Sequence, residues 1–148
     1  MRKICRVMVL VFAVVSCDST GPSFTPAVDL AVHQAQWQRH GIHDYVFDFA
    51  IAGVWVAPPP VRIAVVADTV RSAVVIATGI AAPIAGLPTI DSLFATVGRS
   101  IRSEMGTPVT EYDSKLGYPR SIDTNSSSPP DAGFTITVRS LLPVVLTQ

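Results

Sequence analysis

The chain has 148 residues, of which 49 % are hydrophobic and 15 % are charged, and its 11 basic residues balance its 11 acidic ones. A chain of this length can build one domain around one hydrophobic core. The basic residues are scattered and form no phosphate-binding cluster, which argues against nucleic acid as a partner.

The N-terminal segment is typical of a secretion signal. Basic residues at positions 2, 3 and 6 precede an apolar run over residues 7–15, which is too short for the ~20 residues that span a bilayer. The string Val14-Val15-Ser16-Cys17 resembles the lipobox of a bacterial lipoprotein. This resemblance implies cleavage before Cys17, lipidation of its sulfur and attachment to a membrane outside the cytoplasm.

We therefore predict a signal peptide over residues 1–16, a lipidated cysteine with a polar tether over residues 17–24, and a single domain over residues 25–148. A buried N-terminal strand or helix, and a plain secretion signal with an incidental cysteine, are the alternatives. Asp18 resembles the inner-membrane retention signal of enteric bacteria. Because that rule does not hold in all bacteria, the choice between inner and outer membrane stays open.

Cleavage and lipidation would leave the domain without a free cysteine. Cys5 would leave with the signal and Cys17 would carry the lipid, so neither a disulfide nor a thiol nucleophile nor a thiolate metal site is expected. Three basic residues would also be removed, which gives the remaining 132 residues a net charge of −3.

The first element that the pattern predicts in the domain is a helix over residues 26–40. Thr25 suits the N-cap and Pro26 suits the first helical position. Apolar residues recur at spacings of three and four, which turns Leu30 and Trp37 toward the core.

Strands dominate the next part of the chain. A period of two over residues 44–51 places alternate aromatic side chains on one face of a strand. Residues 53–60 form a loop, because three consecutive prolines cannot lie within a sheet. A hairpin follows, with arms over residues 61–67 and 70–78 and a turn at Asp68-Thr69 that contains no glycine, so its type stays open.

The second half repeats this order of helix and strands. After a loop over residues 79–88, Thr89 caps a helix whose apolar stripe extends to Met105. Three short strands are predicted over residues 109–113, 120–124 and 133–139. The order α-β-β-β-α-β-β-β predicts an α+β fold, in which about six strands form an antiparallel sheet and two helices pack on one face.

Three histidines are the candidate metal ligands. His40 and His43 lie close to a carboxylate in the sequence, and His33 lies on the same predicted helix as His40. A metal site needs further ligands in a fixed geometry, so solvated histidines at the end of a helix are the simpler interpretation. We predict no metal, and a metal-assisted hydrolase that uses these histidines is the enzymatic alternative.

The string from Tyr112 to Pro119 is the most distinctive one after the signal. It predicts the end of a strand, a turn in which Gly117 takes a positive φ, and entry into the next strand. Tyr112 and Tyr118 are candidates to frame a binding surface with Asp113 as a polar contact. The alternative is a purely structural hairpin.

Trp55 is a further candidate for this binding surface, because an aromatic side chain beside prolines on a loop is often exposed. It is as well suited to close the end of the sheet.

The sequence predicts no catalytic residue and no cofactor. No serine lies in a Gly-x-Ser-x-Gly or Ser-x-x-Lys pattern, and there is no phosphate-binding glycine pattern. Asp44 and Asp48 are expected on the outward face of a strand, without the apolar surroundings that tune a carboxylic acid for proton transfer.

Several strings together resemble an uncharacterised family of small bacterial lipoproteins with a domain of unknown function, DUF6174. The resemblance covers nearly the whole chain after the signal. It rests on Trp37, Tyr45, the valine-rich hairpin, Thr89-Ile90-Asp91-Ser92-Leu93-Phe94, and Tyr112-Asp113 with Gly117-Tyr118-Pro119. It implies no activity. Val54 and Val56 stand where family members often carry two cysteines, so no disulfide or thiol role is implied.

We therefore expect a membrane-tethered, non-enzymatic domain that binds another envelope protein or a ligand outside the cytoplasm. A small-molecule or lipid carrier, with a cavity between sheet and helices, is the alternative of a different class.

Overall fold

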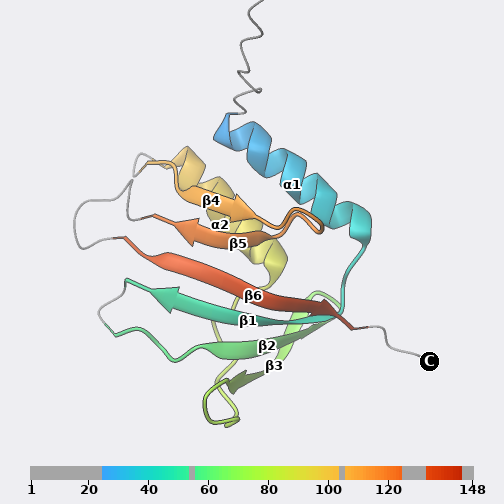
Figure 1. Cartoon of the computed structure of the whole chain (residues 1–148), viewed down its shortest axis with the longest axis vertical. Helices are drawn as coiled ribbons and strands as arrows, with labels where there is room; N and C mark the ends of the chain where they lie inside the picture. Colours follow the sequence, from blue (N-terminus) through green and yellow to red (C-terminus); the bar gives the residue numbers. More distant parts are fainter. Residues whose placement is uncertain (1–24, 54–55, 104–105, 125–132, 145–148) are drawn as a thin grey trace, which may run out of the picture.

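A computed structural model describes residues 25–53, 56–103, 106–124 and 133–144 of the chain (Figure 1). Two helices and six strands alternate along these residues. Their bounds are α1 Pro26–His40, β1 Tyr45–Ala52, β2 Val61–Val66, β3 Thr69–Val75, α2 Ile90–Arg102, β4 Val109–Tyr112, β5 Pro119–Asp123 and β6 Thr135–Pro143.

The strands form a single antiparallel sheet in the order β3-β2-β1-β6-β5-β4. Both helices pack on one of its faces (Figure 1), because the rings and aliphatic side chains that face inward from the strands share one core with Trp37 of α1 and the apolar stripe of α2. The predicted α+β fold with this element order is confirmed.

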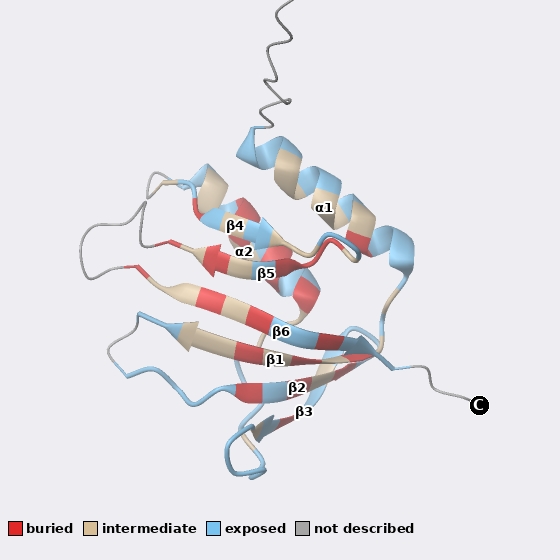
Figure 2. Ribbon diagram, in the orientation of Figure 1, coloured by how far each residue is buried: buried red, intermediate tan, exposed pale blue. Residues whose placement is uncertain are grey.

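The core follows from two periodicities in the sequence. Along β1 every second side chain is buried, with Tyr45 and Phe47 fully enclosed. Along α2 the buried positions recur at helical spacing, and they include Leu93, Phe94 and Val97. Figure 2 shows these buried residues in red, on the sheet and on the side of α2 that faces it.

The helix ends differ in how they are capped. Thr89 accepts a hydrogen bond from the backbone N–H of Ser92, and the Ser92 hydroxyl accepts one from the N–H of Thr89, which completes a capping box. Thr25 occupies the N-cap of α1 as predicted, but its side chain makes no capping hydrogen bond. Gly41 ends α1 in the left-handed conformation.

The turn and the end of the β2–β3 hairpin differ from the prediction. The β2–β3 turn lies at Ala67 and Asp68, which both have positive φ, so it comes one residue earlier than the pattern indicates. β3 ends at Val75, because residues 76–78 turn back and the N–H of Val75 bonds to the carbonyl of Ile80.

β6 is longer than predicted and continues to Pro143. A bulge near Ser140, whose φ is 52°, shifts its register against β1. The alternation of apolar side chains is broken at the bulge, although pairing resumes with Leu142 opposite Val46.

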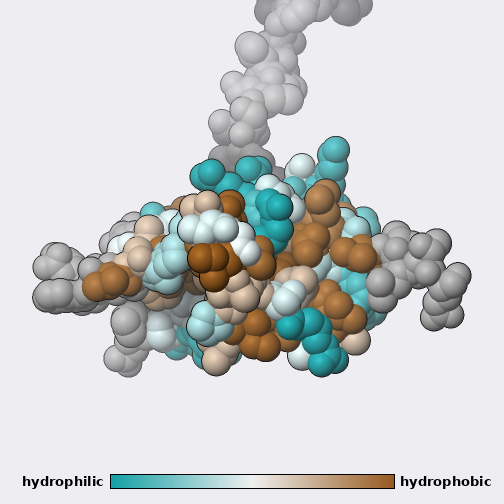
Figure 3. All heavy atoms as spheres, turned by 90° about the horizontal axis from the view of Figure 1, so that it is seen from below, coloured by the Kyte–Doolittle hydropathy of each residue, from teal (hydrophilic) through white to brown (hydrophobic). Residues whose placement is uncertain are grey.

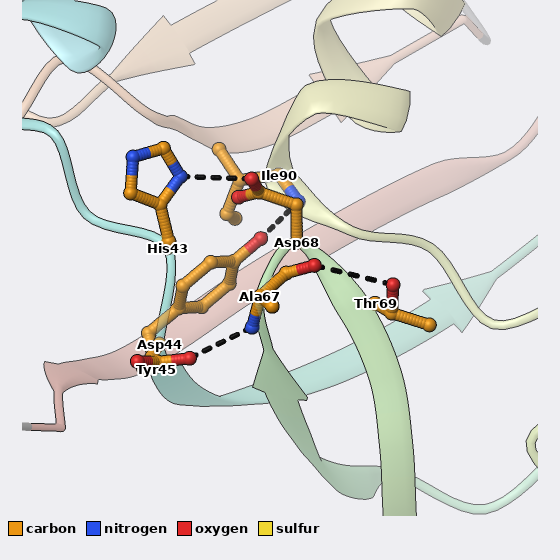
Figure 4. A network of polar contacts seen from close by, with 7 residues as sticks. All are labelled: His43, Asp44, Tyr45, Ala67, Asp68, Thr69 and Ile90. Atoms are coloured by element: carbon orange, nitrogen blue, oxygen red, sulfur yellow. Dashed lines mark hydrogen bonds and ion pairs between the residues drawn. The ribbon is translucent and has the colours of Figure 1, made fainter. Parts of the chain in front are cut away.

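Tyr45 connects the sheet to both helices. Its hydroxyl accepts a 3.0 Å hydrogen bond from the backbone N–H of Ile90 at the start of α2 (Figure 4). Its ring meets the indole of Trp37 edge to face, with the centroids 5.5 Å apart. Burial raises the pKa of Tyr45 to about 12, and this outweighs the opposite effect of the hydrogen bond from Ile90.

Replacing Tyr45 by phenylalanine tests this connection. The Ile90 N–H loses a buried acceptor, so the free energy of unfolding at neutral pH should fall by about 1–3 kcal/mol. Because folding favours the protonated phenol, Tyr45 contributes stability that is fully present below pH 10 and is lost as the pH rises toward 12. Urea denaturation between these pH values should show that the free energy of unfolding falls less steeply with pH in Tyr45→Phe than in the unsubstituted protein. An equal fall in both proteins would contradict the buried position of the phenol.

Candidate functional site

The β4–β5 hairpin, which the sequence singles out, is docked against α1. The side-chain amide of Gln36 donates to the backbone carbonyls of Ser114 and Lys115, at 3.1 and 2.9 Å. The Nε2 atom of His40 lies 3.0 Å from the same Lys115 carbonyl. The hairpin tip therefore takes its position from the polar edge of the helix.

Asp113 shapes this turn from within. Its carboxylate accepts hydrogen bonds from the backbone N–H groups of Lys115 and Leu116, at 2.9 and 2.8 Å. The N–H of Gly117 bonds back to the Asp113 carbonyl, and Gly117 has the predicted positive φ of 84°. The carboxylate that we considered as a contact for a partner is thus engaged in its own turn.

The two tyrosines of the hairpin contribute to packing. The half-buried ring of Tyr112 stacks on His33, with the centroids 4.1 Å apart and the planes 5° from parallel. Tyr118, the second candidate for a binding surface, is buried with only 7 % of it accessible, and its ring lies against Trp37. Burial raises the pKa of Tyr112 to about 12 and also raises the pKa of Tyr118.

Two of the predicted site residues, Cys17 and Trp55, lie outside the described residues. Their proposed roles in lipidation and in partner contact remain predictions.

The three histidines have separate partners. His33 Nδ1 lies 2.9 Å from the backbone carbonyl of Asp29, and His43 Nδ1 lies 2.8 Å from the Asp68 carboxylate (Figure 4). His40 contacts the hairpin as described above. Within the described part of the chain, no group of three or more His, Cys, Asp or Glu side chains is placed to hold a metal ion.

Carboxylates near the start of β1 stabilise the adjoining hairpin. Asp44 accepts a 2.7 Å hydrogen bond from the N–H of Ala67 in the β2–β3 turn (Figure 4). Asp48 forms a two-point ion pair with Arg62 on β2, and the Arg62 guanidinium holds the pKa of Asp48 below its usual value. Burial raises the pKa of Asp91, and the nearby Asp68 carboxylate adds to this effect.

Four exposed aliphatic side chains lie on the edge strand β3 and on the segment that follows it. They are Val74, Ile76, Ile80 and Ile84, which we call the aliphatic patch. Figure 3 views the molecule from the side of β3 and shows hydrophobic residues in several places on this surface. The segment is fixed against β3, because the N–H of Ala82 bonds to the carbonyl of Ala73 at 2.8 Å.

An apolar pocket of about 280 Å³ adjoins this segment. Phe49, Val61 and Val75 line it from the strands, and Pro83 and Leu87 line it from the segment that leads to α2. The space between the sheet and the helices differs from it, because Tyr45, Phe47 and Phe94 are among the large side chains that fill that layer.

Residues 29–143 match a family of unknown function, DUF6174. This match covers more than half of the chain. The chain belongs to the DUF6174 family. No curated protein and no solved structure matches it.

Sequence reasoning on this DUF6174 domain missed the aliphatic patch. The pattern assigns Ile76 to the second arm of the predicted hairpin, over residues 70–78, and it predicts a loop of small residues and prolines over residues 79–88. The available signal was the presence of large aliphatic residues at 76, 80 and 84, where a solvated loop is normally polar. Among the described residues, no helix is both long and apolar enough to cross a membrane.

The contact between hairpin and helix can be tested at Gly117. A Cβ atom at this position would lie 2.6 Å from the His33 carbonyl oxygen, whereas Gly86 has a similar φ of 80° and nothing within 4 Å of its Cβ position. Gly86→Ala should cost about 1–2 kcal/mol through backbone strain alone. Gly117→Ala should cost about 1–3 kcal/mol more, because the helix must shift.

The two variants are compared by thermal and urea denaturation. Equal losses of stability in both variants would show that the β4–β5 turn of the DUF6174 domain does not lie in close contact with α1.

Proposed function

We propose that this protein is a lipid-anchored domain of the bacterial cell envelope that binds an envelope protein or ligand and catalyses no reaction. The support for the anchor is the sequence Val14-Val15-Ser16-Cys17 after a short apolar run. The support for binding is the aliphatic patch with its adjoining pocket.

The aliphatic patch is the observation that carries this proposal. Ile80 is 66 % exposed, and the other three members are each at least one third exposed. Exposed clusters of large aliphatic side chains weaken solubility and are typical of surfaces that bind partners. Backbone hydrogen bonds to β3 fix this segment, so a partner would meet a preformed surface and little ordering entropy would be lost.

The arrangement of the domain gives the patch an orientation relative to the anchor. The tether over residues 18–24 spans at most about 25 Å when extended. It leads to the start of α1, whereas the patch lies around β3 at the opposite end of the domain (Figure 1). A domain anchored in this way can present the patch away from the lipid, toward other components of the envelope.

The proposed anchor depends on one atom, the sulfur of Cys17. Cys17→Ser in the full chain should move the protein out of the membrane fraction or block its processing, because without the sulfur no thioether bond can attach the lipid. Fractionation of the producing cells, with mass spectrometry of the N-terminal peptide, measures both effects. An unchanged membrane fraction with unchanged processing would contradict the anchor.

The proposed binding surface can be tested at Ile80. Cross-linking of the lipidated protein in intact cells, followed by mass spectrometry, should capture a reproducible envelope component. Ile80→Asp should abolish this capture, because a charge is placed at the centre of an apolar contact. Leu142→Asp is the matched control, since Leu142 is 63 % exposed but lies on β6, away from the patch.

Capture that survives Ile80→Asp, or that both variants abolish equally, would show that the partner does not recognise the aliphatic patch. Thermal melting of both variants confirms that they remain folded.

A further inference from the structure

The apolar pocket beside the aliphatic patch has walls from several parts of the chain. Phe49 and Val61 are core residues of β1 and β2, and Val75 ends β3. Pro58 and Pro59 form a second wall, and Pro83 lies in the segment that runs alongside β3. All of these side chains are apolar, so the strands and both loops contribute to one hydrophobic lining.

This pocket is held open by the backbone around it. The pyrrolidine rings of the three prolines fix φ, which limits the inward movement of their segments. The segment above the pocket is fixed to β3 at two points, where the N–H of Val75 bonds to the Ile80 carbonyl and that of Ala82 to the Ala73 carbonyl, each at 2.8 Å. These hydrogen bonds fix the backbone on this side of the pocket.

The lining selects the chemistry of a ligand. None of the described residues that line the pocket is charged, so an ionised group would lose its hydration there without compensation. The volume of about 280 Å³ lies near the lower limit of ligand pockets, roughly 300–1,000 Å³. A short, flexible hydrocarbon fits both conditions.

We propose that this pocket binds the acyl chain of a free amphiphile, such as a fatty acid, with the polar head group left in solvent. The proposal deepens the proposed function and rests on it, because an envelope domain anchored to a membrane meets such molecules continuously. Residues of β1, β2, β3 and the segment after β3 line the pocket, and β2 and β3 lie at the opposite end of the domain from the start of α1 (Figure 1). The proposed ligand is therefore a separate molecule and not the lipid on Cys17.

The probe for this site is a medium-chain fatty acid that carries a diazirine and an alkyne. It is supplied to cells that produce the full chain, and irradiation is followed by peptide mapping. Light-dependent adducts are expected within residues 58–61 and 75–87. Absence of adducts there, while other membrane proteins of the same cells are labelled, would overturn the proposal.

A filled pocket provides the second test. Ala82→Phe places a ring in the pocket from a partly buried position. Labelling should fall roughly tenfold, which corresponds to about two methylenes of the acyl chain that are no longer buried. Ala85→Phe is the matched control, because Ala85 is exposed in the same segment and is not part of the lining. Equal labelling of both variants would also overturn the proposal.

Two further measurements separate the possible failures. If Ala82→Phe does not fold by thermal melting, Ala81→Phe takes its place, since Ala81 lines the pocket from an exposed position. Cys17→Ser is fractionated in parallel, and pocket labelling should persist in it. If the unsubstituted protein shows no labelling in the pocket while Cys17→Ser is released from the membrane or is not processed, the pocket alone is refuted. If Cys17→Ser shows an unchanged membrane fraction and unchanged processing, the anchor is refuted.

Discussion

The enclosed phenol of Tyr45 determines how the two halves of the chain meet. A helix begins with backbone N–H groups that have no partner within the helix, and the start of α2 lies inside the core. Tyr45 supplies an acceptor for the N–H of Ile90 and places its ring against Trp37 of α1 at the same time. The first strand thereby fixes the start of one helix and the inner face of the other, and β4 to β6 are built around that arrangement.

The polar edge of α1 binds the β4–β5 hairpin. Gln36 and His40 hold the carbonyls at the tip, and Gly117 approaches the helix so closely that a side chain does not fit. This explains why a polar and aromatic string that looks functional in the sequence has a structural role in the fold. The partners of Asp113 and of the Tyr118 ring lie within the domain.

Local patterns predicted much of this fold because local burial decides it. The alternation along β1 and the stripe of α2 give the element type directly, and the bounds of α1 agree with the predicted residues 26–40. The bulge at Ser140 and the turn at Ala67 depend on contacts with β1 and Asp44, which lie far away in the sequence. The position of residues 80–82 beside β3 likewise depends on backbone hydrogen bonds to that strand.

The prolines at residues 58–60, which interrupt the pairing of β1 with β2, also help to form the pocket. β1 and β2 pair only up to Phe49 and Val61, because residues 58–60 have no N–H groups to continue the ladder. Ala50 to Ala52 therefore pair with β6 alone. On their other side the described residues form no strand, and the pocket lies there between β1 and the prolines. A sheet that stops early next to a fixed apolar segment leaves room that core packing normally removes. The prolines that end the pairing of β1 with β2 thus also line the apolar pocket.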